Sequence, residues 1–581
     1  MAKVNGGELI VRELVKQGVT EVFALSGGHI DPIFQACADH GIRIIDTRHE
    51  AAAVHMADGY ARTTGRPGVA IVTAGPGVTN AITGLANAYM DAVPLICIGG
   101  RSPLRDDDRM PLQGMDQIAL ATPVTKFART VLQAERIPEY VAMAWRHAVS
   151  GRPGPVFLDV PIDIMFSSVD EENAPTFERF QPEGLPVPRI ESIDRALDIL
   201  AAAERPVIFA GGGVMFSNAQ DELRQFVAMT QVPVFASAKA RGAIPEWSNM
   251  GYGSFALAAS PLARAAAGGP PDLVMLLGAR VGMFTGAGPM SLIPPTARVI
   301  QVDIEPEEIG RARHVDVGLI GDIRETLLLM MDRARGRVFH ENDAWLDAFA
   351  NSRTALRDMH SALMGRETPI HQARLAREIA DLIQGDGIIV ADGGETSLWI
   401  SEQAVVASAG DFLSHGYLGC LGVGIPFAIA AAVARPDKRV LAIVGDGSVG
   451  LNIAELDTAV RHNIPIVVVV NNDQGWGMIR HGQASRYGPD HVVGAELGPT
   501  RYDLVGEGFG AHAEFVTNAS DIRSALERAF KSGKPACVNV LTDPTQPHTA
   551  SIAAAPKKEA EKHDESVDLP YYGRARPIVS R

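Results

Sequence analysis

Short runs of apolar residues, each followed by a segment with helical periodicity, recur along nearly the whole chain. Typical runs are GVAIVTAG at residues 68–75, RPVIFAGGG at 205–213 and IPIVVVV at 464–470. Polar residues do not alternate with apolar ones inside these runs, and β-branched residues are frequent. This pattern is typical of parallel strands that helices cover on both faces. The sequence therefore predicts an α/β protein of doubly wound parallel sheets, which bind ligands at the carboxyl ends of their strands.

Two polar stretches divide these runs into three blocks. The first, residues 166–192, is rich in proline and acidic residues, and the second, between residues 331 and 371, is less distinct. A chain of 581 residues suffices for about three domains of ordinary size. We expect three domains and a C-terminal tail, at residues 1–165, 190–335, 370–550 and 553–581.

Composition excludes several classes of function. The chain has 68 acidic and 53 basic residues, a formal net charge of −15, which argues against nucleic acid or an anionic membrane as the partner. No apolar run approaches the roughly 20 residues that span a bilayer, and the N-terminal segment resembles an amphipathic helix, not a signal peptide. The four cysteines are far apart, so neither a disulfide framework nor a zinc site is expected. These features predict a cytoplasmic enzyme.

A glycine-rich turn, GDGSVG at residues 445–450, follows one of the apolar runs. Its glycines would let backbone N–H groups approach a phosphate where a helix starts. Asp446 in this turn is suited to Mg²⁺, which prefers oxygen ligands. One helix and one strand later the sequence reads NNDQGWG, residues 471–477. Since neighbouring parallel strands end at the same edge of a sheet, we expect both clusters to face one ion.

These motifs resemble those of the thiamine diphosphate enzymes, in which an NN-type cluster follows a GDG turn at this spacing. Residues 44–62 (IIDTRHEAAAVHMADGYAR) and 73–100 resemble the segments that bind the pyrimidine of the cofactor. Residues 151–164 (GRPGPVFLDVPIDI) resemble the end of that domain in acetolactate synthase-like members. The resemblance implies a pyrimidine-binding domain, a central nucleotide-binding-like domain and a diphosphate-binding domain, in this order.

The resemblance also implies the cofactor site. Thiamine diphosphate supplies a carbon nucleophile and an electron sink, and the protein must activate and orient it. Glu50 falls on the family's catalytic glutamate, whose carboxyl group contacts the pyrimidine. Two subunits share each cofactor in this superfamily, which implies a homodimer or homotetramer. The other cofactor contacts implied are Gly394, Glu395, Thr396, Gly419, Leu421, Gly445, Asp446, Gly447, Ser448, Asp473, Gly475, Trp476 and Gly477.

The register of the second cluster decides the metal ligands. In the family the second metal-binding side chain is the later Asn of the NN pair, 27 positions after the Asp of the GDG turn, and 473 − 446 = 27. We therefore expect Asp446, Asp473 and the backbone carbonyl of Gly475 to bind Mg²⁺, with Asn472 as a neighbour that pairs with backbone. A register with one residue deleted before the strand would return this role to Asn472.

The chain as a whole resembles benzaldehyde lyase and the 2-hydroxyacyl-CoA lyases of the oxalyl-CoA decarboxylase group. This likeness places His29, Gln113 and His415 near the reactive carbon, where polar side chains can move a proton. The main hypothesis is a lyase that cleaves a 2-hydroxyacyl-CoA to formyl-CoA and an aldehyde or ketone, with Glu496 or a histidine as the base. The alternatives are a benzaldehyde-lyase-like or acetolactate-synthase-like carboligase on free 2-hydroxyketones or 2-oxoacids, and a non-catalytic binding protein on the same fold.

Two features favour an acyl-CoA substrate. The central domain resembles a dinucleotide half-site that holds FAD in acetolactate synthases and ADP in CoA-using relatives. ADP, FAD and an empty site all stay open, with ADP preferred to FAD. The tail would close as a lid over a bound CoA ester and exclude water, or else be disordered. The residues expected to contact nucleotide or CoA are Arg152, Arg280, Asp303, Asp322, Tyr571, Tyr572, Arg574 and Arg576.

Overall fold

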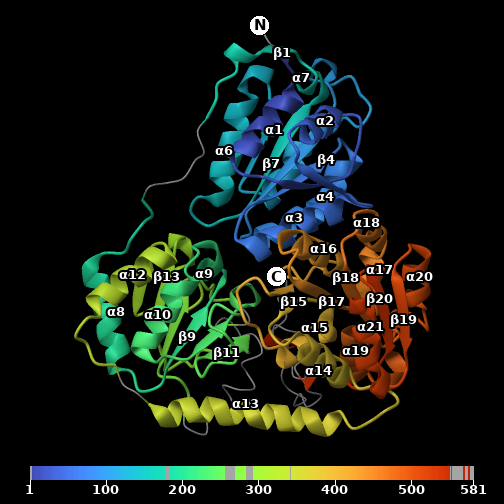
Figure 1. The fold of residues 1–581 in the computed structure, drawn as a ribbon. Coiled ribbons are helices and arrows are strands. Elements are labelled where there is room, and N and C mark those ends of the chain that lie inside the picture. Colours follow the sequence, from blue (N-terminus) through green and yellow to red (C-terminus); the bar gives the residue numbers. More distant parts are fainter. Residues whose placement is uncertain are drawn as a thin grey trace, which may run out of the picture.

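The computed structural model describes residues 3–177, 184–254, 269–282, 285, 292–339, 342–549, 551, 567–569 and 573–575. Within them lie three six-stranded sheets, each with helices on both faces (Figure 1). All strand pairs inside these three sheets are parallel, as in β4 with β5, β12 with β13 and β17 with β18. The predicted α/β class with three doubly wound parallel sheets is thus confirmed.

The first sheet has the strand order β3-β2-β4-β5-β7-β6. Its strands are β2 (Glu21–Ala24), β3 (Arg43–Asp46), β4 (Gly68–Val72), β5 (Leu95–Arg101), β6 (Phe127–Thr130) and β7 (Pro155–Pro161). The helices around it are α1 (Gly6–Lys16), α2 (Asp31–Asp39), α3 (Glu50–Thr64), α4 (Pro76–Met90), α5 (Gln117–Ala121), α6 (Ile137–Val149) and α7 (Ile162–Met165). The predicted N-terminal helix is α1, which starts where the Asn5 side chain accepts a hydrogen bond from the Glu8 N–H. Such a cap satisfies one of the free N–H groups of a first helical turn.

The second sheet has the order β11-β10-β9-β12-β13-β14. Its strands are β9 (Pro206–Ala210), β10 (Val234–Ala236), β11 (Gly251–Ser254), β12 (Leu273–Leu277), β13 (Arg298–Asp303) and β14 (Val317–Ile320). The helices described here are α8 (Ile190–Ala202), α9 (Gly212–Phe216), α10 (Gln220–Thr230) and α12 (Ile323–Arg333). Gly211 and Gly213 lie against the backbone of Gly278, where a Cβ would overlap it, so the turns after β9 and β12 touch.

The third sheet has the order β16-β15-β17-β18-β20-β19. Its strands are β15 (Gly387–Asp392), β16 (Phe412–Ser414), β17 (Arg439–Gly445), β18 (Ile466–Asn472), β19 (His512–Val516) and β20 (Ala536–Leu541). Its helices are α14 (Gln372–Ile383), α15 (Gly394–Gln403), α16 (Gly424–Ala434), α17 (Asp446–Asn452), α18 (Glu455–Arg461), α19 (Gly477–Tyr487), α20 (Tyr502–Gly508) and α21 (Ile522–Lys531). The strand β18, predicted from its run of valines, is buried along its whole length.

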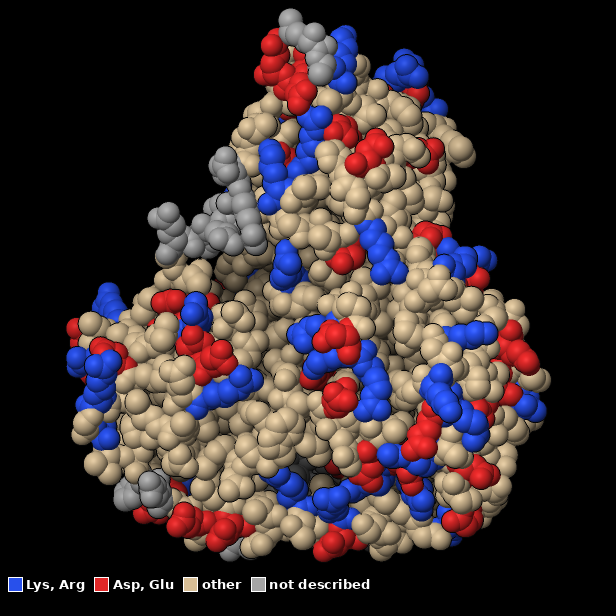
Figure 2. Space-filling view, in the orientation of Figure 1, with Lys and Arg blue, Asp and Glu red and all other residues tan. Residues whose placement is uncertain are grey.

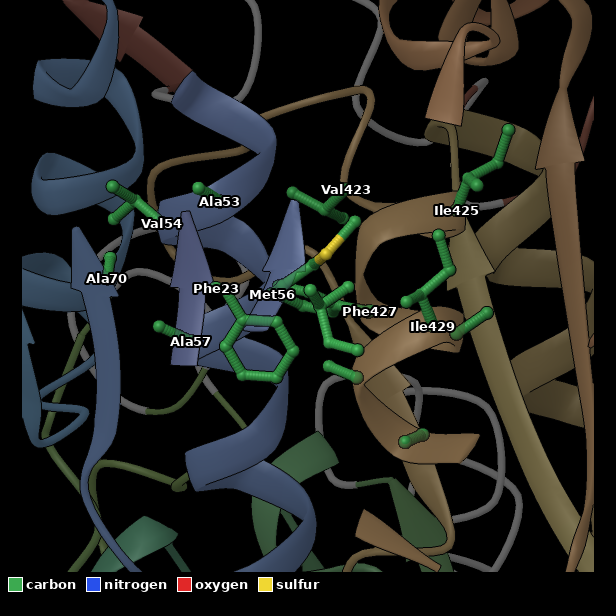
Figure 3. Packing of buried hydrophobic residues seen from close by; sticks show 14 of the residues in the cluster. Phe23, Ala53, Val54, Met56, Ala57, Ala70, Val423, Ile425, Phe427 and Ile429 are labelled. Carbon is green, nitrogen blue, oxygen red and sulfur yellow. The ribbon is translucent and has the colours of Figure 1, made fainter. Parts of the chain in front are cut away.

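Helices α3 and α16 pack the first domain against the third. Nearly every residue of α16 is apolar and buried, because one side faces its own sheet and the other faces α3. Figure 3 shows Met56 of α3 beside Val423 and Phe427 at this contact. A Cβ on Gly59 would come within 3.0 Å of the Phe427 Cα, so glycine permits the close approach. Each such apolar side chain contributes about 1.5–3 kcal/mol when fully buried.

The second polar stretch contains a long helix, α13 (Asp343–Leu363), although the sequence suggested only a divider between domains. This helix runs along both the central and the third domain (Figure 1). Trp345 packs on Phe349 at its start, with ring centroids 4.5 Å apart, in the core of the central domain. Near its end, His360 Nε2 lies 3.0 Å from Glu402 Oε2 of the third domain. The tail contributes one described hairpin, β21 (Val567–Leu569) with β22 (Gly573–Ala575).

Lys and Arg side chains are interspersed with Asp and Glu on the face shown in Figure 2, so neither sign gathers there into a large patch. No helix in the described ranges is long and apolar enough to cross a membrane. All four cysteines lie in described segments and are free thiols.

Candidate cofactor site

Asp446 and Asp473 lie side by side at the carboxyl edge of the third sheet. Gly445 at the end of β17 pairs with Asn471 of β18, so the next residues of both strands meet. Burial raises the pKa of Asp446, helped by the Asp473 carboxylate. Burial likewise raises the pKa of Asp473, against the lowering effect of Arg480. Two facing carboxylates in a buried site favour a shared proton or a cation.

The donor set fits a divalent cation. Asp446 Oδ2 is buried and has no hydrogen-bond partner among the described residues. The Asp473 carboxylate lies beside Asp446, and the Gly475 backbone reaches Asp446 through its N–H; carboxylate oxygens are ligands that Mg²⁺ binds. No group of three or more His, Cys, Asp or Glu side chains is arranged for a metal ion in the part of the chain that the structure describes. A site here would therefore rely on two carboxylates, backbone and the cofactor's own oxygens.

The side chains of Asn471 and Asn472 are occupied elsewhere. Asn472 Nδ2 donates to the Thr500 carbonyl at 3.1 Å and to Asn539 Oδ1 at 3.0 Å, and its Oδ1 accepts the Gln474 N–H at 3.1 Å. Asn471 bonds to Gln372, Thr396 and Thr542. Both amide side chains thus form hydrogen bonds that hold the end of β18 in place. Asn472 pairs with backbone groups, the arrangement expected if Asp473 takes the metal-binding position.

Two segments converge on the Asp446 turn. Helix α15 begins at Gly394, and a Cβ on Gly445 would come within 3.3 Å of Thr396 Oγ1 in its first turn. A Cβ on Gly447 would come within 2.5 Å of the Trp476 ring, and one on Gly477 would overlap the Asp473 carboxylate. These glycines let Trp476 and Asp473 pack against the backbone where α17 begins, and the Gly447 N–H donates to Asp446 Oδ1 at 3.0 Å; a helix N-terminus suits a phosphate.

Arg480 and His481 of α19 belong to this edge, and sequence reasoning missed both. His481 Nδ1 lies 3.0 and 2.9 Å from the two carboxylate oxygens of Glu395, and its Nε2 lies 2.8 Å from the Pro544 carbonyl. Burial, the largest single effect, works against protonation of His481, but the hydrogen bond and charge of Glu395, the Pro544 carbonyl and the Asp473 charge together raise its pKa. Arg480 donates to the Asp473 carbonyl at 3.1 Å and to the Glu496 carboxylate at 3.1 and 3.2 Å. The signal that could have found them is two cationic residues in the first turns of the helix after GWG.

Glu50 begins α3 at the carboxyl edge of the first sheet. It is 7% exposed, and Asn80 Nδ2 donates to its Oε2 at 2.9 Å. His29 Nδ1 lies 3.4 Å from Thr73 Oγ1, and burial lowers its pKa. The structure thus gathers Glu50 and His29 around the segment after β4.

Gln113 belongs to the same edge. It has a positive φ of 61°, a conformation that L side chains rarely adopt. A Cβ on Gly75 would come within 2.8 Å of the Gln113 Cβ, so Gln113 lies over the turn after β4. Among the described residues, no hydrogen bond or ion pair joins this group to the Asp446–Asp473 pair.

The remaining expected contacts lie in two loops of the third domain. His415 and Leu421 are half-buried and Gly419, with φ +70°, is exposed, all in the loop between β16 and α16. Burial lowers the pKa of His415, and its Nδ1 has no hydrogen-bond partner in the described ranges. Glu496 lies between α19 and α20. Its backbone forms a β-bridge with Gly475, and its side chain is 69% exposed.

The residues expected at a nucleotide make other contacts. Arg280 Nη2 donates to the Met90 carbonyl at 2.6 Å. Asp322 caps α12, where its Oδ1 accepts the Glu325 N–H at 3.1 Å. Asp303 accepts the Glu305 N–H at 3.0 Å, and burial raises its pKa to about 6. Arg152 is half-buried, and its charge lowers that pKa.

The tail residues expected at CoA are not tested by these contacts. Tyr571, Tyr572 and Arg576 lie outside the described residues, and Arg574 lies in β22.

The chain matches three models of thiamine pyrophosphate enzymes. These are the N-terminal TPP binding domain over residues 4–120, the central domain over 193–330 and the C-terminal TPP binding domain over 392–540. A probable acetolactate synthase of Mycobacterium bovis and the acetolactate synthase large subunit IlvG of Mycobacterium tuberculosis are each 37% identical over 93% of this chain and 96% of their own. The acetolactate synthase isozyme 2 large subunit of Escherichia coli is 32% identical over 93% of this chain and 96% of its own.

The chain therefore belongs to the thiamine pyrophosphate enzymes, and it depends on thiamine diphosphate. The relatives are acetolactate synthases, so these matches favour the carboligase alternative over the expected likeness to 2-hydroxyacyl-CoA lyases. Their names refer to neither coenzyme A nor ADP. The motifs that suggested the lyase lie around the cofactor, where enzymes of one superfamily share their chemistry.

Proposed function

We propose that the protein is a carboligase of the acetolactate synthase type, which makes or breaks a carbon–carbon bond beside the carbonyl of a 2-oxoacid. The observation that carries the proposal is the extent of the likeness: relatives of that name are 37% identical over 93% of this chain and 96% of their own. A match of this length covers all three domains.

Glu50, Asp446 and Asp473 carry the main roles in this proposal. When bound, thiamine diphosphate supplies a carbon nucleophile and an electron sink. Glu50, oriented by Asn80, would contact the pyrimidine of the cofactor through its carboxyl group. Asp446 and Asp473 would hold Mg²⁺ together with the carbonyl of Gly475, and the first turn of α15 would bind the diphosphate. His29, Gln113 and His415 move or hold protons at the reacting oxygen.

A second copy of the chain would complete the site. Glu50 lies at the edge of the first sheet and the metal pair at the edge of the third, and no described hydrogen bond or ion pair joins them. In the superfamily that the chain resembles, the first domain of one subunit and the last domain of its neighbour share one cofactor. This supports a homodimer or a homotetramer.

A 2-hydroxyacyl-CoA lyase is the second candidate, and the position of Glu496 favours it. The backbone of Glu496 forms a β-bridge with Gly475, which lies in the loop after β18. The Glu496 carboxylate is largely exposed and forms an ion pair with Arg480. The Glu496 carboxylate could act as the base that takes the proton of a substrate hydroxyl, a step that a lyase requires. In addition, the C-terminal family model ends at residue 540, so the tail with its expected CoA contacts lies beyond it.

One pair of assays separates the two candidates. The purified chain, supplied with thiamine diphosphate and Mg²⁺, is given pyruvate in one assay and a 2-hydroxyacyl-CoA in the other. Acetolactate from pyruvate supports the first candidate, and formyl-CoA supports the second. A chain lacking residues 556–581 tests the lid: unchanged turnover of the CoA ester would remove the tail from the mechanism. A chain inactive on 2-oxoacids, 2-hydroxyketones and CoA esters alike would be a binding protein on this fold.

A further inference from the structure

Asp91 lies in a buried charge cluster that joins residues of all three domains. It follows the last turn of α4 and is 6% exposed. Arg62 Nη1 donates to Asp91 Oδ2 at 2.7 Å, and Asp58 holds the other side of the same guanidinium at 2.6 and 3.2 Å. Lys239 of the central domain donates to the Asp91 carbonyl at 2.5 Å, and its Nζ lies 3.5 Å from Oδ1. One carboxylate of the first domain therefore meets cations from two domains.

The same carboxylate fastens the loop between β16 and α16 of the third domain. The Tyr417 N–H donates to Asp91 Oδ1 at 3.0 Å. A Cβ on Gly416 would overlap the Asp91 carboxylate, so only glycine lets the loop backbone come this close. Arg62 Nη1 also reaches the Ser414 carbonyl at 3.5 Å. Asp91 and its partner Arg62 thus contact the end of β16 at Ser414 and the loop that follows it at residues 416 and 417.

The central domain contacts this loop and the end of α4 together. Arg280 donates to the Met90 carbonyl, and its guanidinium carbon lies 5.1 Å from the centre of the Tyr417 ring. A Cβ on Gly282 would come within 2.6 Å of the Tyr417 hydroxyl. The stem of Lys239 lies over Gly212, at the turn after β9. The central domain thereby holds both Asp91 and the loop that Asp91 fastens.

We propose that Asp91 is a positioning residue for the loop from His415 to Leu421, and that Lys239 ties the central domain to it. The proposal rests on the function proposed above and on the cofactor contacts that the family resemblance implies for Gly419 and Leu421 of this loop. A buried carboxylate is held firmly only while its cations and hydrogen-bond donors remain in place. Loss of Lys239 or of the Asp91 charge releases the loop, and the cofactor loses contacts on one side.

The test measures the affinity of the full-length chain for thiamine diphosphate by calorimetric titration in the presence of Mg²⁺. Asp91→Asn keeps the shape of the side chain and removes its charge, and Lys239→Met removes the ammonium group. We expect each to weaken binding by about tenfold, since unpairing a buried charge is costly. The double variant should be no weaker than the worse single variant, because both changes act through one contact.

Glu246→Gln is the matched control. Glu246 is also buried, pairs with Arg241 at 2.7 Å, and accepts the Val406 N–H at 3.0 Å across the border between the central and third domains. It lies outside the loop, so this variant should lower the melting temperature and leave cofactor affinity unchanged. Equal loss of affinity in Glu246→Gln would make Asp91 a structural residue only and overturn the proposal.

Two further outcomes decide the remaining cases. Should Asp91→Asn fail to fold, Gly416→Ala displaces the same loop without removing a charge, and an unchanged cofactor affinity in that variant would overturn the proposal. If the unmodified chain bound no thiamine diphosphate, the proposed function itself would fail. If the unmodified chain binds and Asp91→Asn binds equally well, only the role of Asp91 fails.

Discussion

The imidazole of His481 contacts both carboxylate oxygens of Glu395, at 3.0 and 2.9 Å, beside the turn that is expected to hold the diphosphate. Glu395 is 4% exposed, and a lone buried carboxylate there would repel the phosphates. The raised pKa of His481 favours its charged form, which offsets the charge of Glu395. The pair therefore keeps this side of the site close to neutral.

His481→Ala should weaken thiamine diphosphate binding by about tenfold, because it leaves Glu395 buried without its cation. The double variant His481→Ala with Glu395→Gln should restore much of the affinity, since the amide carries no charge. Calorimetric titration with cofactor measures both. If the double variant bound as weakly as His481→Ala, the charge of Glu395 would not be the cause.

Asp473→Ala should reduce Mg²⁺ affinity about a hundredfold or more, since even partners of metal ligands cost 10–100-fold when removed. Asn472→Ala should destabilise the fold by about 1–3 kcal/mol, because it unpairs buried groups, but change the Mg²⁺ requirement little. The measurement is cofactor binding at increasing Mg²⁺. The opposite ranking would move the register by one residue and return the ligand to Asn472.

Glu50→Gln should slow the exchange of the cofactor's C2 proton by about a hundredfold or more, the range expected for loss of a general acid–base group. Exchange on the bound cofactor is stopped with acid at successive times, and NMR of the released cofactor measures how far it has gone. Asn80→Ala, which removes only the hydrogen bond to Glu50, should slow it less. Normal exchange in Glu50→Gln would remove this residue from the mechanism.

Glu455 should make the chain less stable as the pH rises. Its side chain is buried between the first and third domains, where it accepts the Arg48 N–H at 3.1 Å, and burial raises its pKa from 4.5 to about 7. Between these values the unfolded chain has lost the proton and the folded chain keeps it, so stability falls from pH 4.5 to 7 and then levels off. The loss is up to about 3 kcal/mol for a shift of this size. Glu455→Gln should remove this part of the pH dependence in thermal unfolding; an unchanged slope would mean that another group causes it.

Phe427→Ala should destabilise the contact between α3 and α16 by about 3–5 kcal/mol, the usual cost of deleting a buried ring. Phe427→Leu, which keeps most of the volume, should cost less. Urea unfolding measures both as shifts of the first transition. Equal, small shifts would mean that the two helices hold together through other side chains.

The sequence predicted those features that are local in the chain. The three sheets follow from unalternated apolar runs such as the one that forms β18, and the turn spacing brought Asp446 and Asp473 to the same sheet edge. Contacts between distant segments were not visible. Arg280 donates to Met90 and Asp322 caps α12, contacts that the sequence did not indicate; their expected role at a nucleotide stays a prediction. Arg480 and His481 form a cationic pair after GWG, but the sequence does not show which residues, 7 and 86 positions away, this pair contacts.

The helix α13 has a mechanical consequence for the whole molecule. Its 21 residues form a rod of about 30 Å at 1.5 Å per residue. The Trp345 end is set in the core of the central domain, and the His360 end contacts Glu402. One residue inserted into α13 would rotate its His360 end by about 100° and break the contact with Glu402. An insertion in a flexible linker would leave the positions of the two domains unchanged. The spacing and the rotation of the two domains are therefore encoded in the length of one helix.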